Sequence, residues 1–265
     1  MKSVVYRTAI SISVIILALL ISQQLSLSNP LDVYKPSAKF CLSLKWWGMS
    51  AYGTMEVIRN DKVKEQDVIL VSSQTKELSG LLGFLIKLLR IYKGSNTFDS
   101  YIDTKTGLPV RYEVYKLNDD GTKKLNDHVY FDRKNKRIAS YDDNSTILSN
   151  VQPDIQDIFS GFLNLIRMFN TEDIYIGKQF SFNLYLYKET SKLDMRVISQ
   201  SIVDGNKVYT LKVDKLPDVF KYPASATFDV VEKEGLRLPT KGTCTIDFPI
   251  SNINIDGELI LLNEL

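Results

Sequence analysis

The sequence predicts a mainly β protein, with one antiparallel sheet that is curved or rolled into an open barrel and two helices packed on it. Apolar and polar residues alternate in many short runs after residue 37, which is the pattern of strands with one buried face. Turn-forming residues separate these runs, and only two segments show helical spacing of apolar residues. Many short strands at hairpin spacing favour an antiparallel sheet over a layered α/β fold.

The N-terminal residues have the pattern of a secretory signal peptide. Lys2 and Arg7 flank the start, an apolar run follows over residues 8–21, and a polar tail ends the segment. This three-part order predicts a signal peptide over residues 1–28 that is cleaved after Ser28. Two alternatives are an uncleaved anchor over residues 8–22 in the inner membrane and a buried core helix.

An exported protein follows from this signal, and we expect it in the periplasm. Residues 29–265 contain no Pro/Ser-rich linker and no internal repeat. We therefore expect them to form a single β-rich domain. The absence of a break in composition favours one continuous sheet over separate domains.

The charge of the chain is nearly balanced. Lys and Arg number 33 against 31 Asp and Glu, which gives a formal charge of +2. Removal of residues 1–28 takes away Lys2 and Arg7 and no acid, so the remainder is neutral. Nucleic-acid binding depends on many phosphate-neutralising cations, so the composition excludes that class of partner. Membrane contact is expected only through the N-terminal segment or transiently.

The clearest predicted hairpin lies in the second half of the chain. Over residues 180–187, Phe180, Phe182 and Leu184 share one face, and residues 193–197 alternate in the same way. Residues 188–192 are the predicted turn. The other predicted strands are Val110–Leu117, His128–Phe131, Val208–Val213, Phe228–Val231, Cys244–Ile250 and Ile253–Ile260, with turn signals at 118–121, 204–206, 234–235 and 256–257.

The first predicted helix, over residues 78–92, is apolar around much of its circumference. Such a helix is usually buried, so one interpretation is a plug in the open side of a curved sheet. A second interpretation is a mobile lid over an apolar cavity, because barrels often hold ligands in their mouths. A third is contact with a membrane surface through its basic flank. The lid residues would be Leu78, Leu82, Leu85 and Leu89.

The second predicted helix spans residues 154–169 and has a single apolar stripe. Ile158, Phe162 and Phe169 recur on it at helical intervals. Pro153 and Asp154 suit its start, and Asp157 in the first turn would complement the helix dipole.

Cys41 and Cys244 both lie in strand-like surroundings. An exported chain can form disulfides, so the two cysteines are a candidate bridge between the first and last parts of the domain. The alternative is two separate buried thiols that fill space as small apolar groups. Mass spectrometry with and without reductant distinguishes the two.

The sequence offers little catalytic chemistry. One histidine and two cysteines exclude most zinc sites and Cys/His clusters, and neither a nucleophile elbow nor a phosphate loop occurs. His128 is expected at a solvated turn edge. Carboxylate pairs such as Asp99 with Asp103 and Asp154 with Asp157 are expected in turns and caps. We predict a protein that is not an enzyme, without catalytic, cofactor-binding or metal-ligating residues and without a cofactor.

Several segments taken together resemble an exported bacterial family, the domain of unknown function 3108 family. The similarity covers roughly residues 38–262 and rests on the order and spacing of short motifs. These are the opening strands over 40–57, Phe98–Asp103 followed by Gly107-Leu108-Pro109, Gln156–Ser160 with Leu165–Arg167, Gly177-Lys178, and Leu238-Pro239.

The resemblance implies an exported, mainly antiparallel β domain with no known activity, and it supplies no catalytic residues. Cys41, the Trp46-Trp47 pair and the 215–223 region depart from the family pattern. Asp103, Pro109, Gln156, Asp157 and Ser160 are the motif positions, and the resemblance implies that they act as turn and cap residues.

Two functions agree with these observations. The first is a non-enzymatic cell-envelope protein that binds or carries an apolar ligand, such as a lipid or acyl chain, inside the curved sheet. The alternative is a structural or protein-interaction module that assists cell-envelope assembly through sheet edges or exposed aromatic residues. A third and weaker candidate is a hydrolase that acts on envelope polymers through its carboxylates.

Overall fold

The computed structural model describes residues 39–46, 49–75, 96–117, 122–186, 188–215, 224–247 and 252–261. Within them, fourteen strands form one antiparallel sheet in the order β8-β7-β6-β5-β4-β3-β2-β1-β14-β13-β12-β11-β10-β9. The predicted mainly β, antiparallel fold is confirmed. The strands are β1 (Lys39–Trp46), β2 (Met49–Val63), β3 (Gln66–Thr75), β4 (Asn96–Asp103), β5 (Pro109–Leu117), β6 (Lys123–Asp132), β7 (Arg137–Ser140), β8 (Thr146–Ser149), β9 (Gln179–Leu186), β10 (Glu189–Val203), β11 (Asn206–Lys215), β12 (Ala224–Lys233), β13 (Leu236–Asp247) and β14 (Asn252–Leu261).

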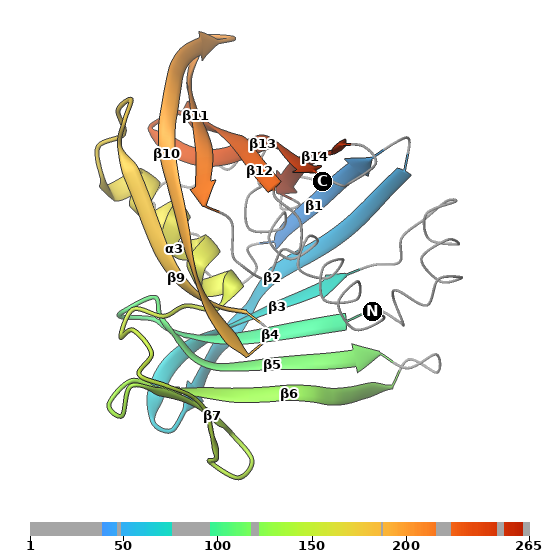
Figure 1. Ribbon diagram of the computed structural model, residues 1–265, viewed down its shortest axis with the longest axis vertical. Helices are drawn as coiled ribbons and strands as arrows, with labels where there is room; N and C mark the ends of the chain where they lie inside the picture. Colours follow the sequence, from blue (N-terminus) through green and yellow to red (C-terminus); the bar gives the residue numbers. More distant parts are fainter. Residues whose placement is uncertain are drawn as a thin grey trace.

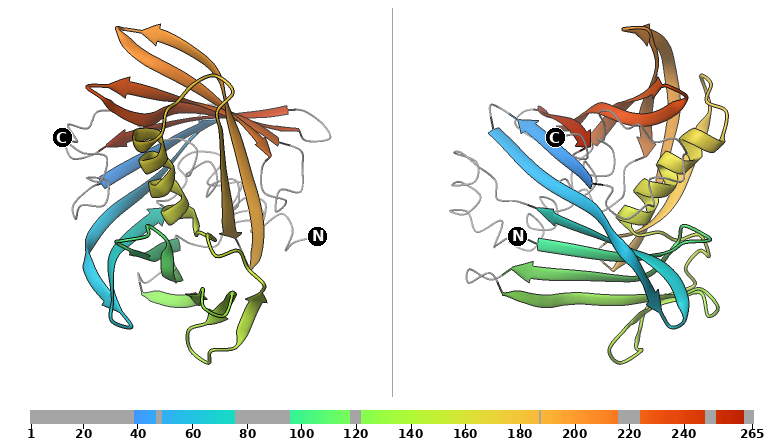
Figure 2. Two further views of the ribbon diagram at one scale, coloured as in Figure 1. Left: turned by 90° about the vertical axis from the view of Figure 1, so that its left-hand side faces the viewer. Right: turned by 180° about the vertical axis from the view of Figure 1, so that it is seen from behind.

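The sheet curves strongly and has two arms. Strands β3 to β8 form one arm and β9 to β13 the other, and β2, β1 and β14 join them (Figure 1). Seen from the side and from behind, the arms face each other across a concave side on which helix α3 (Ile158–Thr171) lies (Figure 2). The curvature agrees with the predicted rolled sheet, because a long twisted sheet buries its apolar face by curling over it.

One apolar core joins the two arms. Helix α3 packs chiefly against β4, β9 and β13, and Phe159, Ile166 and Phe169 are among its buried residues. On the arms, Phe180, Phe182 and Leu184 lie in the same core, so the predicted face of the second hairpin is confirmed. Phe169 meets Phe180 edge to face, with ring centroids 5.2 Å apart, which is a favourable arrangement of two aromatic rings.

Helix α3 begins later than the sequence predicts. The predicted start at residue 154 is wrong, because residues 152–155 form a turn and Asp157 is the N-cap, with extended backbone. The side chain of Asp157 accepts hydrogen bonds from the amides of Phe159 and Ser160, at 2.9 Å each. Asp157 is therefore the N-cap of the helix and not a member of its first turn, and it satisfies two of the free amides there.

The residues before α3 cover one edge of the sheet. The amide of Gln156 donates to the Asn183 carbonyl at 2.8 Å, and the amide of Tyr185 donates to the Gln156 carbonyl at 2.7 Å. These bonds make a short parallel bridge to β9. The outer edge of β9, which ends the strand order, thus has a main-chain partner over this stretch.

Turn chemistry was a good guide at two positions and a poor one at two others. The hairpin turns at 204–205 and 234–235 are present, each with positive φ at both residues. Residues 256–257 are not a turn, because Gly257 pairs with Leu44 on one side and Gly242 on the other. The predicted turn over 188–192 is also wrong, since β10 already begins at Glu189.

Two further expectations concern parts of the chain at its first strand and before β4. The helix predicted over 78–92, with Leu78, Leu82, Leu85 and Leu89, lies outside the described residues. Within the described part of the chain α3 is the only helix, so the prediction of two is met for one.

Cys244 is a free, buried thiol. Cys41 stands opposite Ile260 on β14, and Cys244 stands opposite Ile255 on the other side of that strand. A whole strand therefore separates them, and the candidate disulfide is not formed. Neighbouring strands lie close to 5 Å apart, so a bridge across two of them would exceed the reach of a disulfide.

Arg237 on β13 holds the C-terminal end of α3. Its guanidinium donates to the carbonyls of Phe169, at 3.1 Å, and Glu172, at 3.0 Å, and it also pairs with Glu232 at 2.7 Å. The backbone of Arg237 exchanges two further bonds with the side-chain amide of Asn170. Carbonyls at a helix end lack partners within the helix, so a cation there is stabilising.

We expect Arg237→Ala to lower the free energy of unfolding by about 2 kcal/mol at pH 7, because charged hydrogen bonds contribute about 1.5–3 kcal/mol. The hydrogen bond from Arg237 lowers the pKa of Glu232. The ion pair therefore contributes above the ordinary Glu pKa and is lost as the pH falls through the lowered one. Urea unfolding should show the difference from the wild type narrowing at acid pH.

Arg196→Ala is the matched control, because the Arg196–Asp214 pair lies on the surface. Exposed pairs contribute under about 1 kcal/mol. Equal losses for the two arginine variants would contradict a role for Arg237 at the end of α3.

Candidate functional site

The concave side of the sheet is the first candidate site. We call it the inner face and define it by the core residues that the two arms turn toward α3. On one arm these include Met55, Val57 and Val71, and on the other Leu211, Val213 and Phe228, all buried in one cluster. An apolar surface of this kind binds apolar groups and offers no charge for catalysis.

Two buried hydroxyls of this core have no hydrogen-bond partner. Ser73 follows Ile69 and Val71 on the same face of β3, and its Oγ is buried and unpaired. The Oη of Tyr185 is also unpaired, and its ring packs edge to face on Phe131 and Tyr112. Burial, followed by the charge of Asp127, raises the pKa of Tyr185. Buried polar groups are normally satisfied, so each of these hydroxyls calls for an explanation.

The motif residues form a polar network at the start of α3. Asp157 is fully buried and accepts a hydrogen bond of 2.5 Å from the hydroxyl of Ser100 on β4. Burial raises the pKa of Asp157. The hydroxyl of Ser160 donates to the Asp157 carbonyl at 3.1 Å. This network ties the beginning of α3 to the strand beneath it, since a buried carboxylate is tolerated only when its oxygens are bonded.

The remaining motif positions lie around the β4–β5 turn. Asp103 accepts bonds from the amides of Lys105 and Thr106, at 2.9 and 2.7 Å, and Pro109 is the first residue of β5. The side chain of Asn164 links this turn to Gln156 by donating to the Gly107 carbonyl and to Gln156 Oε1. In the structure these positions therefore hold turns and caps together.

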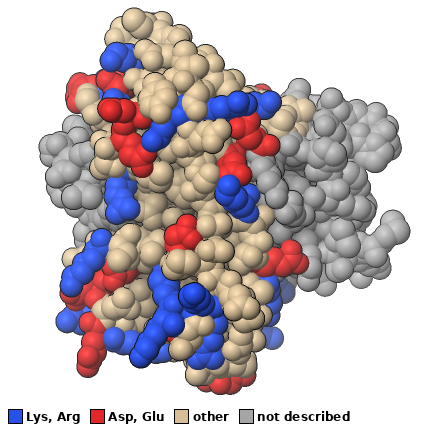
Figure 3. Space-filling view, turned by 60° about the vertical axis from the view of Figure 1, so that its left-hand side comes forward, with Lys and Arg blue, Asp and Glu red and all other residues tan. Residues whose placement is uncertain are grey.

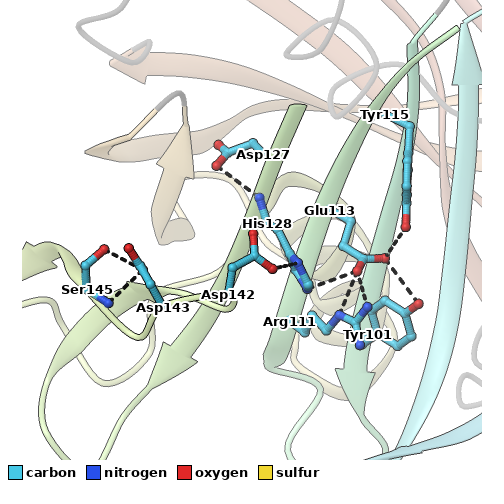
Figure 4. Close-up of polar contacts among 9 residues, drawn as sticks. All are labelled: Tyr101, Arg111, Glu113, Tyr115, Asp127, His128, Asp142, Asp143 and Ser145. Carbon is cyan, nitrogen blue, oxygen red and sulfur yellow. Dashed lines mark hydrogen bonds and ion pairs between the residues drawn. The ribbon is translucent and has the colours of Figure 1, made fainter. Parts of the chain in front are cut away.

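A second cluster lies on the outer face of the same arm, on β4, β5 and β6 (Figure 4). Its centre is Glu113, whose residue is only 1% exposed. One carboxylate oxygen accepts from Arg111, and His128 Nε2 lies 3.0 Å from it. The other accepts from Tyr115 at 2.9 Å and Tyr101 at 3.3 Å. We call these five residues the Glu113 cluster.

His128 links the cluster to the loop after β7. Its Nδ1 lies 3.0 Å from Asp142 Oδ1, and its ring stacks on Tyr141 with centroids 4.3 Å apart. The Arg111 guanidinium lies over the rings of Tyr101 and Tyr141, at 4.6 and 4.5 Å. The expectation of a solvated turn-edge histidine is wrong, because His128 lies within β6 opposite Glu113, with a side chain 10% exposed.

The arrangement of the Glu113 cluster bears on its chemistry. Both carboxylate oxygens have partners within the protein, and the group is shielded from solvent. A general base needs a free lone pair within reach of a substrate proton. Burial is the first cause of the raised pKa of Tyr101, about 12, and the charge of Glu113 is the second. The cluster is thus a closed polar core that fastens three strands and a loop together.

The carboxylate pairs considered for catalysis are separated. Asp99 accepts from Ser72 at 2.5 Å, and burial raises its pKa. Asp154 accepts from the Asn183 side chain on β9. Among the described residues, no group of three His, Cys, Asp or Glu side chains is arranged to hold a metal ion. No helix in the described ranges is long and apolar enough to cross a membrane.

Comparison with known families decides the relationship. The model of the family described as "Protein of unknown function (DUF3108)" matches residues 39–250. The chain belongs to this family. A search of curated proteins gave no match. The predicted resemblance is therefore confirmed over most of the chain, and membership in the DUF3108 family carries no established activity.

Solved structures with a similar course of the chain come from other families of unknown function. A β-barrel-like DUF1849 protein from Brucella abortus has 12% identity, 84% and 94% coverage of this chain and that one, and a TM-score of 0.40. A DUF1329 family protein from Desulfovibrio piger has 11% identity, 89% and 90% coverage and a TM-score of 0.27. A putative outer membrane lipoprotein-sorting protein domain from Vibrio parahaemolyticus has 9% identity, 88% and 87% coverage and a TM-score of 0.27.

Proposed function

We propose that this protein is a non-enzymatic, exported cell-envelope protein that binds an amphiphile through an acyl chain lying on the inner face. The observation that carries the proposal is the inner face itself, an apolar surface that runs from β2 to β13. Helix α3 packs chiefly against β4, β9 and β13, so it accounts for only part of that surface. Burying an acyl chain there would gain about 0.8 kcal/mol per CH₂ group.

The polar groups support the same function. Ser73 adds a buried, unpaired hydroxyl at the end of an apolar row on β3. A hydroxyl in that position is suited to the polar group of an amphiphile. The carboxylates near the core, Asp157 and Glu113, already have their oxygens bonded within the protein, which favours binding over catalysis. The N-terminal sequence pattern supports export.

Balanced charge on the surface fits this kind of ligand. On the side that bears α3 and β9, basic and acidic side chains are interspersed, and neither sign forms a continuous field (Figure 3). A neutral chain offers little long-range attraction to a charged partner. Recognition by shape and apolar contact is the expected consequence.

The test is lipid retention by the full chain with Ser73→Ala. If the Ser73 hydroxyl bonds the ligand, its loss removes about 1 kcal/mol of binding, which corresponds to a decrease in affinity of about fivefold. Native mass spectrometry of purified protein, followed by extraction and lipid analysis, measures the bound fraction. Unfolding of the delipidated variant should match or exceed the wild type, because an unpaired buried hydroxyl has been removed.

Ser72→Ala is the matched control. Ser72 is the neighbouring serine, and its hydroxyl donates to Asp99 instead of pointing to the inner face. This variant should keep its lipid and lose about 1 kcal/mol of stability. Wild-type protein that carries no amphiphile, from any expression host that makes the envelope lipids, would overturn the proposed function.

A further inference from the structure

Strand β10 extends beyond its neighbour β9. The pairing of β9 with β10 covers Glu189–Arg196, whereas the pairing with β11 continues to Val203. The last main-chain partner on the β9 side is at Val197, which bonds Gly177 and Lys178 at 2.8 and 3.0 Å. Figure 1 shows the β10–β11 hairpin projecting past β9 at the top of the molecule. Residues 198–203 therefore form a strand edge with no described neighbour.

The hairpin turn decides which backbone groups point out of this edge. Asp204 and Gly205 have φ of 49° and 79°, the geometry of a two-residue type I′ turn. In such a hairpin the flanking residues, Val203 and Asn206, exchange both hydrogen bonds with each other. Hydrogen-bonding direction alternates along a strand, so Gln200 and Ile202 direct their N–H and C=O groups toward the open side.

The side chains of this edge lack the features that usually protect one. Natural edges carry charges or proline, or are short or covered, and residues 198–203 contain neither charge nor proline. Ile202 is 74% exposed and Val203 51%, and the exposed Tyr175 and Ile176 continue the apolar surface beside Val197. By contrast, β8 at the other end of the sheet is only four residues long.

We propose that a second copy of this chain pairs with this edge, strand against antiparallel strand, with Ser201 on the two-fold axis. In that register Gln200 faces the partner's Ile202, and Ile202 faces the partner's Gln200. Each of these two pairs exchanges two main-chain hydrogen bonds. A two-fold contact of this kind closes after two copies, because the same surface serves on both sides.

Apolar contact and charge both favour a second copy. Ile198 and Ile202 share a face of the strand, so the two copies bring four isoleucines together across the axis. No like charges meet, because the edge is uncharged. The acidic tip residue Asp204 of each hairpin falls opposite Ile198, beside the chain at Lys178 of the other copy. An acid thus approaches a base at both ends of the contact.

Cysteine cross-linking in the full chain tests the register. Ser201 lies opposite the partner's Ser201 in a pair without main-chain bonds, where side chains are closest and a disulfide can form. We expect Ser201→Cys to give a disulfide-linked dimer as the major species under mild oxidation. Ser199→Cys, on the same face of the same strand, faces the partner's Val203 and should remain mostly unlinked, as should the wild type with Cys41 and Cys244.

Sedimentation of the full chain tests the contact without cross-linking. Ile202→Lys places like charges beside each other across the axis and should shift the dimer to monomer, with at least a tenfold weaker dissociation constant. Ile58→Lys on β2, where Ile58 is 43% exposed, should leave the dimer intact. Monomeric wild type throughout the micromolar range, equal cross-linking of both cysteine variants, or a different protein paired with this edge would each overturn the proposal.

Discussion

Replacing Glu113 by alanine is expected to lower the free energy of unfolding by about 3 kcal/mol, because removing one partner of a buried ion pair leaves the other uncompensated. Arg111, Tyr101 and Tyr115 would lose their common acceptor in a site with little access to water. Arg111 keeps a partly exposed side chain, which places the expected loss at the lower end of the range for buried pairs. Urea denaturation at pH 7 measures it.

A spectroscopic measurement separates this mechanism from a general loss of packing. The charge of Glu113 contributes, after burial, to the raised pKa of Tyr101, about 12. In the alanine variant that pKa should fall, which absorbance of the tyrosinate detects. Asp142→Ala is the control, because Asp142 contacts the other side of His128 but has a side chain 69% exposed. A loss for Asp142→Ala as large as that for Glu113→Ala would argue against the buried carboxylate as the centre of the cluster.

Asp157→Ala should also destabilise the protein by about 3 kcal/mol. Loss of an N-cap costs about 1 kcal/mol, and the buried donors that remain unpaired, among them the Ser100 hydroxyl, add about 1–3 kcal/mol. Asp157→Asn keeps an acceptor for the amides of Phe159 and Ser160 and should lose about 1 kcal/mol. Thermal and urea unfolding of both variants provide the measurement.

The pH dependence of Asp157 has a definite sign. Burial raises its pKa in the folded protein. The contribution of this group is therefore fully present below the ordinary Asp pKa and is lost as the pH rises through the folded-state value. The advantage of the wild type over Asp157→Asn should shrink with rising pH across that interval. Asp154→Ala, three residues earlier and exposed, should show no such trend, and a parallel trend in it would remove Asp157 as the cause.

The sequence predicted the strands well where one face is buried. Phe180, Phe182 and Leu184 alternate with polar residues and lie in the core as expected. The start of α3 was less predictable, because Asp154 and Asp157 are both chemically suitable caps. The pairing of Gln156 with β9 decides between them, since it holds the preceding residues in an extended strand-like path. That contact joins residues distant in the sequence, so no local pattern indicates it.

The Glu113 cluster shows how much of a site local pattern can carry. Arg111, Glu113 and Tyr115 alternate within a predicted strand, which places them on one face. Their meeting with His128 depends on the pairing of β5 with β6. The stretch Arg-x-Glu-x-Tyr was the available signal, and it indicates a shared face without indicating what lies opposite. The register between strands supplies the rest.

The central pairing of β1 with β14 has a consequence for how the chain folds. Phe40 stands opposite Leu261, so the contact that unites the two arms closes a loop that comprises nearly the whole chain. Contacts between residues so far apart in sequence carry a large entropic cost before they are rewarded, and folding slows as their share grows. Each arm can assemble from hairpins made of neighbouring strands, whereas their union must wait until the last strand is available. Slow completion of this seam is therefore built into the topology, and the sheet edges at β1 and β14 remain unpaired until it forms.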